Sequence, residues 1–332
     1  MDAEGAARRE VAASAGELEV SIVVPVYHNA GSLPELYERL AAAMREAAVS
    51  GWDVTFVDDG SRDDSLAVLL RLHELQQNVR VLRMSRNFGS MAAIQAGLEH
   101  ARGRATVVIS ADLQDPPEKL PEMIRAWRGG AEVVLAARES REDPFTSRVL
   151  SWAFYRAFRS MVMRDMPPGG FDFFVIDRKV ARVLVASTEK NASLAAAVLW
   201  VGFRRAVVPY HRAARQHGRS MWTFWKKVKY MYDSLLSYSY VPLRVVSGLG
   251  ALATLGALAY AAWIMLHRLT GGEEPAGWAS LMVVTLFFNG FVLMSIGVVG
   301  EYVWRTLDAA RRRPAFIVAD VAEPAQASAE QR

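Results

Sequence analysis

The sequence contains no cysteine, which excludes a disulfide framework, a thiolate metal site and a cysteine nucleophile. It also lacks the glycine-rich dinucleotide pattern, because the turn after the first predicted strand reads YHNAGS, and it has no Walker A pattern. A nicotinamide dehydrogenase and a P-loop enzyme are therefore not expected. Residues 1–19 have no apolar core, so they do not predict a signal peptide, and the first domain is expected in the cytoplasm.

The charge balance shows little excess of either sign. The chain has 39 Lys and Arg against 35 Asp and Glu, a net charge of +4, which is no signature of nucleic-acid binding. The apolar share of 52% lies slightly above that of ordinary globular proteins and indicates a membrane-embedded part. A length of 332 residues suits one large domain or two ordinary ones.

Strand and helix patterns alternate after residues 1–18, an Ala- and charge-rich stretch that we interpret as a disordered tail. This alternation predicts a doubly wound, Rossmann-like α/β domain with a mostly parallel sheet. Ser32 and Glu35 predict a capping box at the start of the first helix. The predicted strands are Val20–Tyr27, Val54–Asp59, Val79–Met84, Ala105–Asp112, Glu132–Arg138, Phe171–Ile176 and Arg204–His211.

The most informative stretch runs from Ser110 to Glu118 and reads SADLQDPPE. Its Pro-Pro pair stops the preceding strand and starts the next helix. Asp112 and Gln114 are expected to leave the strand on the same side. Their oxygens suit a divalent cation that keeps several waters and shares phosphate oxygens with a substrate. Taken alone, the tripeptide from Asp112 to Gln114 has an alternative interpretation, a strand-end turn with a solvated carboxylate.

Polar motifs fall at the carboxyl ends of the predicted strands, the edge of an open α/β sheet where ligands bind. A metal site, a second strand end with two aspartates, and several arginines together predict a pocket for a nucleoside diphosphate. If this pocket is tied to a membrane segment, a lipid is the natural second substrate. The residues concerned are Tyr27, Asp58, Asp59, Asp112 and Arg138.

Two long apolar runs close the chain, and we predict transmembrane helices at residues 243–267 and 277–304. The uncharged cores are Val245–Leu266 and Trp278–Gly300. About 22 residues at ~1.5 Å each cover a hydrocarbon core of ~30 Å. Buried core helices of a large soluble protein are the alternative.

Lys and Arg flank the pair of apolar runs on both outer sides. By the positive-inside rule both flanks lie in the cytoplasm, the short loop between the runs lies outside, and residues 305–332 form a cytoplasmic tail. Residues 219–242 interleave aromatic and Lys side chains and predict an amphipathic helix at the membrane interface, or else a helix packed on the soluble domain. The catalytic domain is thus expected at the inner face of the cytoplasmic membrane, in a multi-pass protein.

Seven motifs occur in order: VPVYHN, VDDGSRDDS, SRNFGSMAAIQAGLEHARG, SADLQDPPE, GGFDFFVIDR, RQHGRS and VVGEYVWR. Together they resemble the family-2 GT-A glycosyltransferases of the dolichol-phosphate mannosyltransferase type. Within that type they are most similar to the bacterial bactoprenol-phosphate glycosyltransferases with two C-terminal spans. The resemblance covers about residues 19–316 and implies a GT-A domain over residues 19–218.

The resemblance implies roles for individual residues. Asp112 and Gln114 would hold Mg²⁺ or Mn²⁺ on the donor diphosphate, and Arg138 and Arg215 would contact the diphosphate or the acceptor phosphate. Asp112, Arg138 and Arg215 are the predicted catalytic residues. The nucleotide-sugar pocket is predicted to comprise Pro25, Tyr27, Asn29, Asp58, Asp59, Ser110, Ala111, Asp112, Arg138 and Arg215.

Four more residues have two interpretations each. Arg148 and Arg156 are candidates for the lipid phosphate, with a solvated basic face as the alternative. Asp172 and Asp177 either shape the acceptor side or cap turns.

The chain departs from the family pattern at three positions. Ser110 stands where the family usually has the first Asp of D-x-D, Asn29 where Glu is frequent, and Met221 where Lys tends to follow R-x-x-G-x-S. Each change removes a charge from the predicted donor site. They point to a different nucleotide or sugar, or to a weaker enzyme.

The implied reaction is a single displacement with inversion. A phosphate oxygen of a polyprenyl phosphate attacks the anomeric carbon of a nucleotide-sugar, with uracil preferred over guanine as the base. Two rivals remain. A processive polysaccharide synthase would carry Q-x-x-R-W, but here Ser220 stands at the position of the Trp. A degenerate sugar-nucleotide-binding scaffold for a membrane partner is the non-enzymatic alternative. A glycosyltransferase that acts on another lipid-linked acceptor also stays open. The sequence leaves a homo-oligomer open.

Overall fold

The computed structural model describes residues 18–140, 166–167, 170–187, 194–211, 232–233, 236, 241–270, 277–311 and 313–323. The chain divides into two compact units, one of residues 1–231 with 314–332 and the other of Tyr232–Arg313. Several predicted features lie outside the described residues: the disordered tail, most of the interface helix, Arg148, Arg156, Arg215 and Met221.

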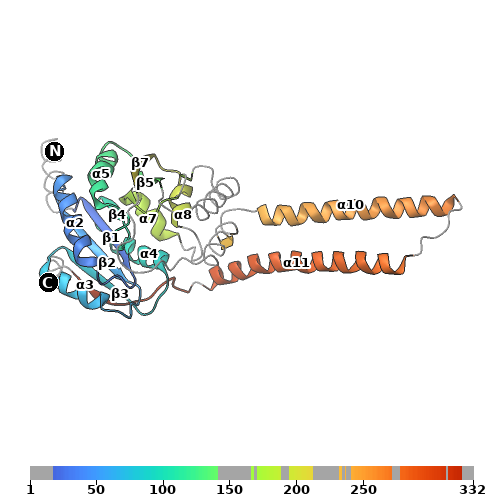
Figure 1. Ribbon diagram of the computed structural model, residues 1–332, viewed down its shortest axis with the longest axis horizontal. Helices are drawn as coiled ribbons and strands as arrows, with labels where there is room; N and C mark the ends of the chain where they lie inside the picture. Colours follow the sequence, from blue (N-terminus) through green and yellow to red (C-terminus); the bar gives the residue numbers. More distant parts are fainter. Residues whose placement is uncertain are drawn as a thin grey trace, which may run out of the picture. The chain divides into compact units, whose positions relative to one another are not determined.

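A single twisted sheet forms the centre of the first unit (Figure 1). Among the described residues it has eight strands in the order β7-β5-β6-β4-β1-β2-β3-β8. Neighbours are parallel, except that β6 runs antiparallel to β4 and β5 and β8 runs antiparallel to β3. The strands are β1 (Val20–Val26), β2 (Trp52–Asp58), β3 (Val79–Met84), β4 (Ala105–Val108), β5 (Val133–Ser140), β6 (Phe174–Asp177), β7 (Arg205–His211) and β8 (Val318–Ala322).

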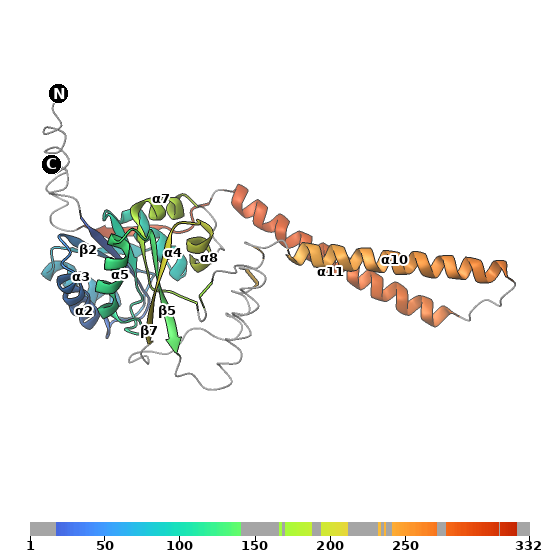
Figure 2. The same cartoon turned by 90° about the horizontal axis from the view of Figure 1, so that it is seen from above.

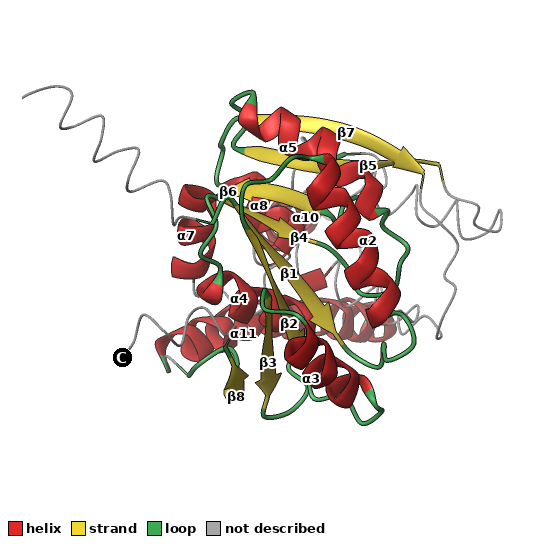
Figure 3. Ribbon diagram, turned by 90° about the vertical axis from the view of Figure 1, so that its left-hand side faces the viewer, coloured by secondary structure: helices red, strands yellow, loops and turns green. Residues whose placement is uncertain are grey.

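Helices cover both faces of this sheet, which gives three layers (Figure 3). Helices α2, α3 and α5 share one face, and α4, α7 and α8 share the other. The short 3₁₀ turn η1 precedes α5 directly. The bounds are α2 (Leu33–Glu46), α3 (Ser65–Leu75), α4 (Ser90–His100), η1 (Pro117–Lys119), α5 (Leu120–Arg128), α7 (Arg178–Ala186) and α8 (Leu194–Trp200).

The core follows from the sequence pattern of the strands. Five of the seven residues of β1 are apolar side chains with no more than 1% exposure, as expected for a strand covered on both faces. Helix α2 contributes a stripe that includes Leu33, Leu36, Leu40 and Met44. On the opposite face α4 packs so closely that a Cβ on Gly97 would lie 2.2 Å from Cγ1 of Val23. Glycine at 97 therefore sets the distance between α4 and β1.

Several sequence predictions are wrong in detail. Strand β4 ends at Val108 rather than at Asp112, and Leu113 has a φ of 60°, so Asp112 and Gln114 sit in a turn instead of an extended strand. The capping box does not form, because Ser32 makes no cap bond with its side chain. Its Oγ lies 2.6 Å from the carbonyl oxygen of Ala111 and 3.0 Å from that of Asn29.

The segment predicted as a cytoplasmic tail, residues 305–332, contains the end of a helix and a strand. Helix α11 continues to Ala310, and Val318–Ala322 adds strand β8 to the sheet beside β3. Arg83 Nη1 lies 3.1 Å from Asp320 Oδ2 across this pair of strands. The segment after the second apolar helix is thus part of the first unit.

The second unit is dominated by two long helices, α10 (Val241–Leu269) and α11 (Trp278–Ala310), which run side by side (Figures 1 and 2). Both are long and apolar enough to cross a membrane, over Leu243–His267 and Ser280–Ala310. Large apolar side chains point outward from both, with Met265 68% and Leu293 70% exposed. Near the C-terminal end of α11, Arg305 pairs with Asp233 at 2.7 Å and with Glu301 at 3.1 Å.

Candidate active site

The sheet topology brings the predicted site residues to one edge. Strand β1 lies between β2 and β4, so the order of strands along the chain reverses direction between β1 and β4. In open α/β sheets the crevice beyond the carboxyl ends of the strands at such a reversal is where ligands bind. Tyr27 and Ser110 follow β1 and β4 at this point. Strand β6 lies between β4 and β5 and is antiparallel to both, so the carboxyl ends of β5 and of its parallel neighbour β7 face the same edge as that of β4.

The turn after β4 holds three oxygen-bearing side chains close together. Ser110 Oγ lies 3.0 Å from Oδ1 of Asp112 and 2.6 Å from Oδ2 of Asp115. The backbone N–H of Gln114 donates to Asp112 Oδ1 at 3.2 Å. Asp112 is 8% exposed and Asp115 is fully buried, so the turn places one carboxylate near the surface and one beneath it.

Two contacts from α2 fix this turn in place. Ser32 donates to the carbonyl of Ala111, and Arg39 grips Glu118 with two bonds, from Nε at 2.8 Å and from Nη2 at 2.9 Å. Such bidentate pairs set orientation as well as distance. The SADLQDPPE stretch is therefore held against α2 at both of its ends.

Arg138 enters the site from the end of β5. Its side chain is 4% exposed; Nε donates to the hydroxyl of Tyr210 at 3.2 Å, and Nη2 pairs with the carboxylate of Asp172. Tyr210 in turn donates to Oδ1 of Asp115. Burial tends to lower the pKa of Arg138, but its attraction to Asp172, Tyr210 and Asp115 outweighs this effect and leaves the pKa above its ordinary value. The guanidinium is a permanent cation at the site edge.

The turns after β1 and β2 are joined through backbone N–H groups. His28 has a φ of 57°, its N–H donates to Ser61 Oγ at 3.1 Å, and its Nε2 accepts from the N–H of Arg62 at 3.1 Å. Asn29 Oδ1 accepts from the N–H of Tyr27 at 3.1 Å, so its amide closes a turn. The Tyr27 ring stacks on His28 with centroids 4.1 Å apart. This arrangement presents an aromatic face beside the reversal point.

The two aspartates after β2 have different surroundings. Asp59 accepts from the backbone N–H of Phe88 at 2.7 Å and of Gly89 at 2.8 Å, so both of its oxygens anchor the turn before α4. Burial raises the pKa of Asp59, and these two bonds act against that rise. Asp58 is 1% exposed and accepts from Ser61 N–H at 3.3 Å. Pro25, in β1, lies beyond the last residue that pairs with β4, so its missing N–H leaves no gap in that ladder.

The sequence missed three residues of this edge: Asp115, Tyr210 and His28. Val208 and Tyr210 both lie on the buried side of β7. A buried tyrosine hydroxyl needs a polar partner, so the alternating pattern of this strand could have indicated Tyr210. Asp172 pairs with Arg138 at this edge, and its role on the acceptor side stays a prediction. Asp177 lies at the end of the inverted β6, where Oδ1 accepts from Lys179 N–H at 3.1 Å and caps α7, so the turn-capping interpretation of Asp177 is confirmed.

Comparison with known proteins identifies the family. A model of glycosyl transferase family 2 matches residues 21–185. A glycosyltransferase of Synechocystis, described as uncharacterised, is 35% identical over 305 residues, which are 92% of this chain and 96% of the relative. The chain belongs to glycosyl transferase family 2. A prophage bactoprenol glucosyl transferase homologue of Escherichia coli is 32% identical over 91% of this chain and 98% of its own length.

This family-2 chain has the GT-A-like α/β fold with a mostly parallel sheet, as the sequence predicted, followed by two apolar helices. Among solved structures, glucosyl-3-phosphoglycerate synthase of Mycobacterium tuberculosis is similar with a TM-score of 0.47 and 14% identity. That match covers 68% of this chain and 79% of the synthase.

The oxygens at this glycosyltransferase edge fit a hard divalent cation in type. Asp112, Gln114 and Ser110 offer a carboxylate, an amide and a hydroxyl, and Mg²⁺ is commonly held by one or two carboxylates with substrate phosphates and water. The hydroxyl of Ser110 has one proton, and the shorter contact directs it to Asp115. The oxygens of Ser110 and Asp112 lie 3.0 Å apart, close enough for both to contact one cation. Among the described residues, no three of His, Asp and Glu gather as a metal cluster of their own.

Proposed function

We propose that this glycosyltransferase moves a sugar from a nucleotide-sugar, a UDP-hexose, to a polyprenyl phosphate at the cytoplasmic face of the inner membrane. The observation that carries the proposal is the match to bactoprenol glucosyl transferases over 91% of this chain and 97–99% of theirs. A match of that extent includes both apolar helices as well as the α/β unit. It favours a lipid-linked acceptor over a soluble one.

The site edge supports this reaction on the donor side. A nucleoside diphosphate leaves with developing negative charge, and preorganised cations near that charge are usually the largest source of rate enhancement. Arg138 would hold the diphosphate through guanidinium N–H groups, while Tyr27 and the buried Asp58 would line the nucleoside. Asp112 and Gln114 would hold Mg²⁺ or Mn²⁺, which would neutralise the leaving diphosphate.

The acceptor needs positioning more than it needs a general base. A phosphate monoester has a second pKa of about 6, so at neutral pH it already carries a nucleophilic oxygen with nearly two charges. Inversion requires that this oxygen attack from the side opposite the leaving diphosphate. Arg215 is the predicted contact to one of the phosphates and stays a prediction, because it lies outside the described residues.

The membrane supplies the second substrate. Helices α10 and α11 expose apolar side chains along lengths that suit a hydrocarbon core of ~30 Å. By the positive-inside rule, Arg244 near the start of α10 and Arg305 with Arg311 near the end of α11 favour a cytoplasmic location for both ends of the pair. A polyprenyl phosphate presents its headgroup on that same side.

The test is an incubation of membranes that contain the full chain with a panel of labelled sugar nucleotides. Label should pass into a lipid that releases it in mild acid, should stop with chelator, and should return with Mg²⁺ or Mn²⁺. Asp112→Asn should lose most of the rate, whereas the matched control Asp177→Asn, on the opposite edge, should keep it. Absence of lipid-linked label with every donor would refute the proposal and favour the scaffold alternative.

A further inference from the structure

A chain of four buried or half-buried side chains runs beneath the donor edge and connects strands β5 and β7 with the turn after β4. Arg138 Nε donates to the Tyr210 hydroxyl at 3.2 Å, Tyr210 donates to Oδ1 of Asp115, and Ser110 donates to Oδ2 of Asp115 at 2.6 Å. Every proton in the chain is directed toward Asp115. The carboxylate of Asp115 therefore has both oxygens occupied and no exposed surface.

The protonation needed for this pattern is consistent with its surroundings. Burial and the nearby carboxylate of Asp115 raise the pKa of Tyr210 above its ordinary value, so the phenol keeps its proton and can donate. Its oxygen is left to accept from Arg138. Buried carboxylates are stable only when paired and hydrogen bonded, and here Asp115 has two hydroxyl donors with the Arg138 cation one step further along.

The two partners of Arg138 differ in how firmly they can hold it. Asp172 has a side chain 66% exposed, so solvent weakens that pair. Tyr210 is 1% exposed and is the residue opposite Arg138 in the register of the parallel strands β5 and β7. Tyr210 therefore holds the Arg138 guanidinium more firmly than Asp172 does, and Asp115 in turn holds the Tyr210 hydroxyl.

We propose that Tyr210 and Asp115 are positioning residues for donor binding, because they hold Arg138 and the Ser110–Asp112 turn in one hydrogen-bonded chain. This inference rests on the proposed function, since it takes the edge formed by Arg138 and Asp112 as the diphosphate site. Neither Tyr210 nor Asp115 contacts the donor in this view. Each acts through Arg138 or through Ser110.

The first test compares Tyr210→Phe with Tyr37→Phe in the full chain. Tyr37 is a matched control because it is also buried and its hydroxyl also makes two bonds, to Gln76 and Asn78 at 3.0 and 2.9 Å, far from the site residues in the fold. Both variants should lower the thermal midpoint. Only Tyr210→Phe should weaken the binding of UDP or GDP, measured by calorimetry with Mn²⁺ present, on the order of tenfold.

The kinetic readout should separate positioning from general loosening. Tyr210→Phe should raise the donor KM by a similar factor and leave the acceptor KM unchanged, and Tyr37→Phe should change neither. Equal UDP affinity in wild type and Tyr210→Phe would overturn the inference and leave the proposed function standing. A wild type that binds neither nucleoside diphosphate would overturn the proposed function, and the inference with it.

The second test asks whether Asp115 connects the two ends of the chain. Ser110→Ala and Tyr210→Phe each remove one donor to the same carboxylate, so their effects on UDP affinity should not multiply in the double variant. Independent, multiplying effects would contradict the connection. If Tyr210→Phe does not accumulate as folded protein, the double-mutant cycle uses Ser110→Ala and Asp115→Asn. Their effects on UDP affinity should likewise not multiply.

Discussion

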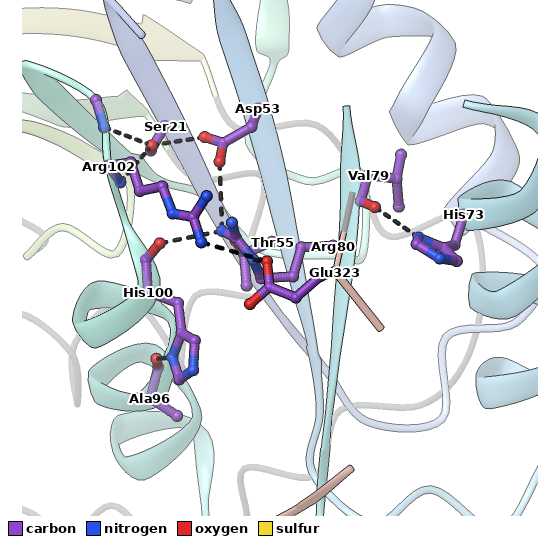
Figure 4. A network of polar contacts seen from close by, with 11 residues as sticks. Ser21, Asp53, Thr55, His73, Val79, Arg80, Ala96, His100, Arg102 and Glu323 are labelled. Carbon is purple, nitrogen blue, oxygen red and sulfur yellow. Dashed lines mark hydrogen bonds and ion pairs between the residues drawn. The ribbon is translucent and has the colours of Figure 1, made fainter. Parts of the chain in front are cut away.

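The guanidinium of Arg80, only 1% exposed, lies with Nε 3.0 Å from the carboxylate of Glu323, a residue 243 positions later in the chain. Figure 4 shows the surrounding network, in which the same guanidinium also donates to Asp53, Thr55 and the carbonyl of His100. Ser21 completes the network by donating to Asp53 at 2.6 Å. The segment after the two apolar helices is thus bonded to a buried charge on β3, the strand next to the sheet edge.

This relationship predicts unequal effects for two similar substitutions. Glu323→Gln removes a charge from the pair with buried Arg80 and should lower the free energy of unfolding by about 1 kcal/mol. Asp320→Asn removes a charge from the exposed pair with Arg83 and should cost no more than a few tenths of a kcal/mol. Thermal unfolding of the two detergent-purified variants, side by side, measures the difference. Equal midpoints would mean that Glu323 does not stabilise Arg80.

The neighbouring aspartates after β2 should separate stability from activity. Asp59→Asn places an amide NH₂ against one of two backbone N–H donors and should destabilise the protein by about 1–3 kcal/mol. Asp58→Asn disturbs only one long bond and should instead weaken nucleotide-sugar binding, with a thermal midpoint near that of wild type. Calorimetric binding and thermal unfolding of both proteins check the prediction. The opposite assignment of effects would move the nucleoside contact from Asp58 to Asp59.

Position 110 should respond to metal in a way that depends on the residue there. Ser110→Ala should cost roughly 1 kcal/mol in transition-state stabilisation, the scale of one neutral hydrogen bond. Ser110→Asp should stay active with metal, but it puts a second carboxylate within contact of buried Asp115. Its thermal midpoint should therefore fall in chelator and recover with Mn²⁺ more than that of wild type. A Ser110→Asp protein with the same metal response as wild type would argue against a cation beside this turn.

The proposed membrane hairpin predicts on which side of the membrane each segment lies. A reporter fused after Arg332 should be cytoplasmic, and one inserted near Gly272, in the loop between the apolar helices, should be external. Alkaline phosphatase and green fluorescent protein fusions at the two positions should give opposite signals. Signals from the same side of the membrane would rule out a hairpin of two spans.

Local patterns in the sequence predicted the parts of the fold that local chemistry determines. Strand β3 matches its predicted bounds, Val79–Met84, because a short, mostly apolar run after polar turn residues is typical of a buried strand. Strand β4 was predicted four residues too long, since the turn at Leu113 depends on contacts such as Ser32 with Ala111, which no local pattern contains. The antiparallel direction of β6 could not be predicted either, because a short apolar run has the same pattern in parallel and antiparallel strands.

The candidate site also combines residues that local sequence predicts with residues that only long-range contacts bring together. The SADLQDPPE stretch and Arg138 could be predicted, since oxygen donors and arginine at strand ends suit a diphosphate. Asp115 could not be assigned, because its partner Tyr210 lies 95 residues later in the chain and reaches the turn only in the folded sheet. Strand β8 was missed for a comparable reason: VADVA has little strand signal, and its stabilising partners, Arg80 and Arg83, are more than 200 residues away.

Strands β7 and β8 occupy the two outer edges of the sheet among the described residues, and the two apolar helices lie between them in the sequence. During synthesis β7 emerges before either apolar helix and β8 only after both. Until β8 is synthesised, one side of β3 therefore stays unpaired in the nascent α/β unit. An open strand edge of this kind can pair with other chains. The sheet is complete only after both apolar helices have left the ribosome, so strand β8 makes folding of the α/β unit depend on synthesis of these helices.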